Sequence, residues 1–145
     1  MKNINLKAIG WGLFVYIGAR AAIQQIAMYA FGLLPDYRLL ALISAIDIII
    51  PAMLVGYITA KLSRGNEIKN SLILGVSLYL IAFLFLSLTR PLALPLFGVL
   101  GFFFFPPQLP YVGTTYRLIG GILITFALIL LGAYLAKKRN QRVTV

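Results

Sequence analysis

The segment LLALISAIDIIIPAMLVGYITA, residues 39–60, is apolar throughout except for one carboxylate, and it decides the predicted fold. As a helix, its 22 residues are long enough to cross a hydrocarbon core of about 30 Å. Asp47 lies well inside this segment, and Pro51 follows four residues later. Because proline has no amide hydrogen, Pro51 predicts a kink and leaves the Asp47 carbonyl without its helical donor. The carbonyl and the carboxylate of Asp47 therefore both need partners at a depth where water supplies none.

The composition of the whole chain also indicates a membrane protein. Of its 145 residues, 61% are hydrophobic and 11% are charged, whereas soluble domains carry about 25% charged residues. Since so few charges cannot cover a water-facing surface, we expect the lipid bilayer to surround the chain. The absence of Cys and His removes the usual ligands of zinc, haem and iron–sulfur clusters. We therefore expect a single transmembrane domain, residues 1–145, without a metal or a cofactor.

Four apolar runs are long enough to cross the membrane as helices, and a polar loop separates the second from the third. The predicted spans are about 8–31, 39–60, 71–89 and 114–136, and the predicted cytoplasmic loop is 61–70. A signal peptide is an alternative interpretation of the first run, with Ala19-Arg20-Ala21 as a cleavage site. The apolar sequence continues beyond that point, which favours a retained span.

The segment 91–110 is apolar but does not form another full span. Pro95, Gly98 and Gly101 interrupt it, and a Pro-Pro pair follows its longest apolar part. Its apolar run, residues 92–105, has only 14 residues, a length more typical of a re-entrant or interfacial segment than of a full span. A fifth span here would place the last basic cluster outside, so four spans are favoured. The predicted fold class is an all-α integral membrane four-helix bundle: two antiparallel transmembrane hairpins, with this segment before the last helix.

The distribution of Lys and Arg predicts the orientation. With four spans, three basic residues lie on one side, Arg20 lies within a span, and nine lie on the other side: Lys2, Lys7, Lys61, Arg64, Lys69, Lys137, Lys138, Arg139 and Arg142. Because cytoplasmic loops carry an excess of Lys and Arg, both termini are expected to be cytoplasmic, in the cell (plasma) membrane. No basic face with interleaved aromatic residues indicates nucleic-acid binding. The basic ends are instead expected to attract anionic lipid.

Arg20 and Asp47 are charged residues placed deep in the first two spans. Arg20 lies 11 residues before the end of the first span, and Asp47 lies 8 residues after the start of the second. These separations correspond to depths of about 16 Å and about 12 Å from the shared outer turn. Adjacent antiparallel helices would bring the two side chains together, and a bidentate contact is the most favourable geometry. We therefore predict an ion pair.

Helical spacing adds neighbours to this pair. Tyr16, Arg20 and Gln24 share one helix face, and Ser44 and Asp47 share another, so together they predict a polar seam between the first two spans. Charges within a membrane often mark a substrate or proton pathway. A neutralised pair can equally fix the register of two helices. The sequence leaves both interpretations open.

Small residues recur at a spacing of four near the cytoplasmic ends of two spans. They are Gly56 and Ala60 in the second span, and Gly132 and Ala136 in the last. Such spacing is typical of close helix contacts, within one chain or with a partner. A parallel repeat of two hairpins is the alternative interpretation.

The residues that catalysis would need are absent or separated. The three carboxylates, Asp36, Asp47 and Glu67, fall at different depths of the predicted topology, and no His is present to activate a nucleophile. We therefore expect no catalytic residues. The sequence favours a non-catalytic interaction, accessory or structural membrane component, with a homo-oligomer or another membrane protein as possible partners. The alternative is a small-solute or ion transporter or channel subunit that uses the Arg20–Asp47 seam.

Overall fold

The structure is a computed structural model, and it describes residues 4–31, 37–63, 65–92 and 114–143. The described residues form four helices: α1 (Leu6–Phe31), α2 (Tyr37–Leu62), α3 (Glu67–Leu92) and α5 (Thr114–Val143). The prediction of an all-helical chain is confirmed for these residues. The predicted re-entrant or interfacial segment lies, beyond Leu92, outside the described residues.

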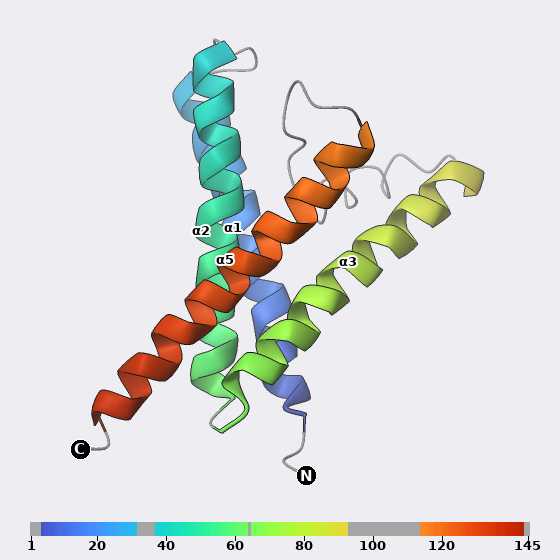
Figure 1. The fold of residues 1–145 in the computed structure, drawn as a ribbon. Coiled ribbons are helices and arrows are strands. Elements are labelled where there is room, and N and C mark those ends of the chain that lie inside the picture. Colours follow the sequence, from blue (N-terminus) through green and yellow to red (C-terminus); the bar gives the residue numbers. More distant parts are fainter. Residues whose placement is uncertain (1–3, 32–36, 64, 93–113, 144–145) are drawn as a thin grey trace.

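The helix α2 is the centre of the arrangement. It contacts each of the other three described helices, and its contact with α5 is the most extensive. In Figure 1, α1 lies alongside α2, α5 crosses α2 obliquely, and α3 diverges from α2 toward its C-terminal end. Because successive helices run in opposite directions, the start of α1, the α2–α3 turn and the end of α5 lie at one end of the molecule (Figure 1).

Three of these helices contain segments long and apolar enough to cross a membrane: Leu6–Ala27, Leu42–Leu62 and Gly120–Gln141. The helix α3 encloses the uncharged run 71–89, whose role as a span stays a prediction. Large apolar side chains are exposed on the outside of the helices, among them Trp11, Phe14, Ile26, Leu42, Ile50, Leu80, Leu84, Leu123 and Leu131. Such a surface is compatible with a membrane protein.

The turn between α2 and α3 is shorter than the predicted loop 61–70, because both helices extend into that polar segment. Gly65 follows the end of α2 with a φ of 89°, a left-handed conformation that favours glycine. The Gly65 amide donates to Oε1 of Glu67 over 3.0 Å, at the start of α3. Hydropathy predicts only where the apolar part of a helix ends. The helix itself continues until its end groups are capped, as they are here.

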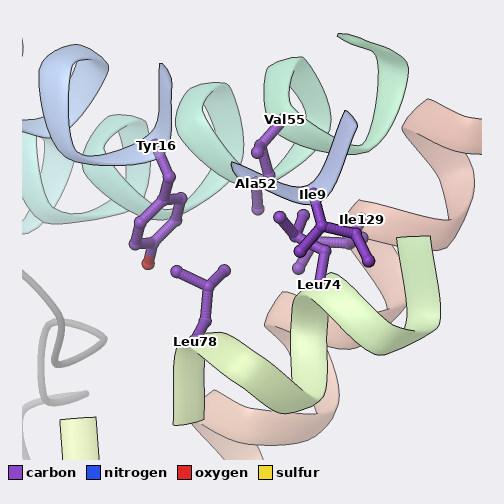
Figure 2. Packing of buried hydrophobic residues seen from close by; sticks show 7 residues of the cluster. All are labelled: Ile9, Tyr16, Ala52, Val55, Leu74, Leu78 and Ile129. Carbon is purple, nitrogen blue, oxygen red and sulfur yellow. The ribbon is translucent and has the colours of Figure 1, made fainter. Parts of the chain in front are cut away.

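The hydrophobic core takes residues from every described helix. Figure 2 shows its seven buried members, which are Ile9, Tyr16, Ala52, Val55, Leu74, Leu78 and Ile129. In a hydrocarbon surrounding, these contacts would stabilise the fold through close packing, because lipid tails are as apolar as the side chains. In such surroundings the stability of this core would depend on how well the side chains fit together more than on burial as such.

The contact between α2 and α5 is made by backbone against backbone. A Cβ atom added to Gly56 would overlap the carbonyl group of Ile129, and one added to Gly132 would overlap the carbonyl oxygen of Met53. Beside them, Ala60, Ala133 and Ala136 form a buried cluster with almost no exposed surface. The two small-residue pairs noted in the sequence thus belong to one interface within the chain, which only glycine permits at its closest points.

Replacing Gly56 or Gly132 by alanine is expected to lower the thermal unfolding midpoint in detergent micelles. The added methyl group would force the two backbones apart, and overpacking of this kind costs about 1–3 kcal/mol. In an open helix position the same substitution is favourable, by up to about 1 kcal/mol.

The matched control is Gly18→Ala on α1, since nothing lies within 4 Å of a Cβ added there. Its unfolding midpoint is expected to be equal to or above that of the unmodified chain. Equal midpoints for Gly56→Ala and Gly18→Ala would contradict a close α2–α5 contact.

Candidate functional site

Arg20 of α1 and Asp47 of α2 form an ion pair between the two helices. Nη2 of Arg20 donates to Oδ2 of Asp47 over 2.7 Å, and Nε donates to the same oxygen over 3.1 Å. The Arg20 side chain is 1% exposed and the Asp47 side chain 6% exposed. The pair therefore connects the two helices at positions that solvent hardly reaches.

The geometry of the pair differs from the predicted bidentate fork in one respect. Nε and Nη2 of Arg20 both donate to Oδ2, whereas Oδ1 of Asp47 is buried and accepts no hydrogen bond from the described residues. A fork with one donor on each oxygen would satisfy the carboxylate more completely. The relative position of the two backbones decides this, and helical spacing alone does not reveal it.

Tyr16 is the third member of the site. Its ring lies one helical turn before Arg20, with the guanidinium carbon 5.9 Å from the ring centre. This places the cation at the outer limit of the distance for a cation–π contact. Tyr16 is itself buried and belongs to the hydrophobic core (Figure 2). Tyr16 therefore belongs both to the ion-pair site and to the core.

The other residues of the predicted seam make no hydrogen bond to the ion pair in the described part of the chain. They are Gln24 and Ser44, and both are half-buried. Pro51 is fully buried within α2, one turn beyond Asp47. Of the residues in the predicted seam, Tyr16, Arg20 and Asp47 are thus the ones in contact with one another in the described part of the chain.

A second polar group, which sequence reasoning missed, lies near the α2–α3 turn. The Asn5 amide donates to Oδ1 of Asn70 over 3.2 Å, and Nδ2 of Asn5 donates to the Leu62 carbonyl over 3.0 Å. Nδ2 of Asn70, Oγ1 of Thr59 and Oγ of Ser63 are buried without a hydrogen-bond partner among the described residues. Thr59 lies in the last turn of α2, whereas Ser63 follows the end of that helix, so helical spacing alone did not predict this group.

Asn5 also determines where α1 begins. Its Oδ1 accepts a hydrogen bond from the Ala8 amide over 3.0 Å, which is the geometry of a helix N-cap. One asparagine therefore caps α1 and ties it to both neighbouring helices. This second group is best explained as a structural junction of α1, α2 and α3.

Comparison with protein families, with curated proteins and with solved structures finds no match. In the described part of the chain, no three residues among His, Cys, Asp and Glu come close enough to hold a metal ion. Glu67 is engaged at the start of α3, far along the chain from Asp47. The Arg20–Asp47 ion pair is therefore the candidate site in the described part of the chain.

Removing one charge of the ion pair is expected to destabilise the protein strongly. Arg20→Ala or Asp47→Ala would leave a buried charge without its partner, which costs about 3–5 kcal/mol. The double variant is expected to be more stable than either single variant, because neither charge remains. Thermal unfolding in detergent micelles, analysed as a double-mutant cycle, would measure this coupling.

Two further variants sharpen this cycle. Arg20→Asp combined with Asp47→Arg restores opposite charges and is expected to recover part of the lost stability. Gln25→Ala is the matched control, since Gln25 is an exposed polar residue of α1, and its unfolding is expected to be unchanged. Strictly additive losses in the double variant would show that the two residues do not act as a clamp.

Proposed function

We propose that this chain is a four-span integral membrane protein that acts as a non-catalytic interaction, accessory or structural component. The observation that carries the proposal is the buried Arg20–Asp47 pair, with side chains 1% and 6% exposed. A carboxylate or guanidinium that handles a passing ion or substrate needs access to water or to that substrate. These two charges neutralise each other instead, as expected of a contact that fixes the register of two helices.

The proposed orientation places the cytoplasm at the end where α1 starts and α5 ends. The basic residues of the α2–α3 turn and of the end of α5 gather at this end of the molecule, which supports the orientation (Figure 1). Anionic lipid of the cell membrane is the expected partner of these charges. The exposed apolar sides of the helices leave room for a second copy or another membrane protein as a further partner.

Transport is the second candidate, and one observation favours it. Oδ1 of Asp47 is buried but accepts no hydrogen bond from the described residues. A carboxylate oxygen in that state gains from any proton or cation that reaches it. A transport subunit would use this oxygen in a conformation in which Arg20 has moved away.

Labelling of single cysteines tests the orientation, because the chain contains no natural Cys. Asp36→Cys, in the predicted outer turn, is expected to react with a membrane-impermeant maleimide in intact cells. Lys69→Cys and Lys138→Cys are expected to react only after the membrane is permeabilised. The reverse pattern, or labelling of all three in intact cells, would contradict four spans with cytoplasmic termini.

Flux measurements in reconstituted vesicles separate the two candidate functions. For a non-catalytic interaction component, we expect proton, chloride and potassium fluxes equal to those of protein-free vesicles. A flux that requires the chain and disappears in Asp47→Asn, while circular dichroism shows that this variant keeps its helix content, would establish the transport alternative. This substitution removes the charge but keeps nearly the same shape.

A further inference from the structure

Near its start, α1 carries a shallow groove on the side that faces away from the other helices. The groove has a volume of about 370 Å³, and the described residues that line it are Lys7, Gly10, Trp11 and Phe14. Their spacing places all four on one face of the helix. This face is turned away from the hydrophobic core, whose α1 members are Ile9 and Tyr16 (Figure 2).

The floor and the wall of this groove have distinct origins. Gly10 provides the floor, since nothing lies within 4 Å of a Cβ added there. Trp11 and Phe14 provide the wall, with ring centres 5.9 Å apart and ring planes at 89° to each other. They are 52% and 68% exposed. A glycine floor beside two bulky aromatic rings makes a shallow apolar groove along the helix.

The groove ends at a positive charge. Lys7 is exposed one turn before Trp11, and none of the described carboxylates forms an ion pair with it. Trp is a residue that often sits at the boundary between hydrocarbon and headgroups. Lys7 beside Trp11 is therefore placed at the level where lipid phosphates lie.

The length of the exposed face matches one leaflet. Lys7 and Gly18 are 11 residues apart, which corresponds to about 16 Å along the helix. Half of a hydrocarbon core of about 30 Å is nearly the same distance. Gly18 is also open, with nothing within 4 Å of an added Cβ.

We propose that this groove binds one phospholipid of the inner leaflet with an anionic headgroup. Its phosphate lies at Lys7, and one acyl chain follows Gly10 between the helix and the rings of Trp11 and Phe14. The proposal depends on the membrane insertion and orientation proposed above. A second copy fits less well, because a parallel two-fold contact across this face would bring two Lys7 charges together.

Trp11 makes the test specific, because it is the one Trp of the chain and it lines the groove. The purified full chain is reconstituted into vesicles containing phosphatidylglycerol or phosphatidylcholine with brominated acyl chains, which quench a nearby Trp. We expect the anionic lipid to occupy the groove about fivefold more strongly, the factor that one lysine near the membrane surface supplies.

Three variants test whether the preference for the anionic lipid arises at this groove. Lys7→Gln is expected to reduce the preference to about one, whereas Lys69→Gln, which removes an exposed charge of α3 near the same end of the molecule, is expected to leave it unchanged. Gly10→Leu is expected to reduce quenching by both lipids, since its side chain would fill the groove. Circular dichroism of each variant checks that its helix content is unchanged.

Each outcome has a separate meaning. Equal quenching by the two lipids, or an equal loss of preference in Lys7→Gln and Lys69→Gln, would overturn the lipid site while leaving membrane insertion intact. An absence of quenching by either lipid would overturn membrane insertion itself. A preference that depends on Lys7 but not on Lys69 supports the site.

Discussion

Arg20 and Asp47 are buried charges that need each other, because a buried charge left without its partner costs about 3–5 kcal/mol of stability. Their contact connects α1 to α2 at one level of both helices, with both donors on Oδ2. A shift by one helical turn, about 5.4 Å, would separate the charges. The register of the first hairpin, and with it the position of Tyr16 in the core, follows from this electrostatic constraint.

The other half of the fold depends on a steric constraint. Gly56 and Gly132 let α2 and α5 approach until their backbones are in direct contact. No larger residue fits at these two positions without displacing a helix. Thus α2 is bound on one side by charge and on another by close packing. These interactions differ in kind: the first tolerates small changes in distance but no loss of a partner, whereas the second tolerates neither an added methyl group nor a shift in angle.

Much of this arrangement could be predicted from particular residues. The deep placement of Arg20 and Asp47 on adjacent antiparallel runs was enough to predict their pairing, because no other charged residue lies within the first two predicted spans. The polar junction at Asn5 and Asn70 could not be predicted in the same way. Its residues stand at helix ends, where asparagine is common for capping alone, and their contact joins positions 65 residues apart.

The sequence by itself determined that the described chain is helical, roughly where its helices run, and which two deep charges must meet. Long apolar runs and isolated charges carry that information locally. Only the tertiary structure decided that α2 is central, that Gly56 and Gly132 meet in one interface, and that the Gly10 face of α1 stays open. The physical reason is that these helices are apolar on nearly all sides, so no amphipathic pattern marks an inner face. Which faces meet is then settled by the fit between side chains and backbones distant in the chain.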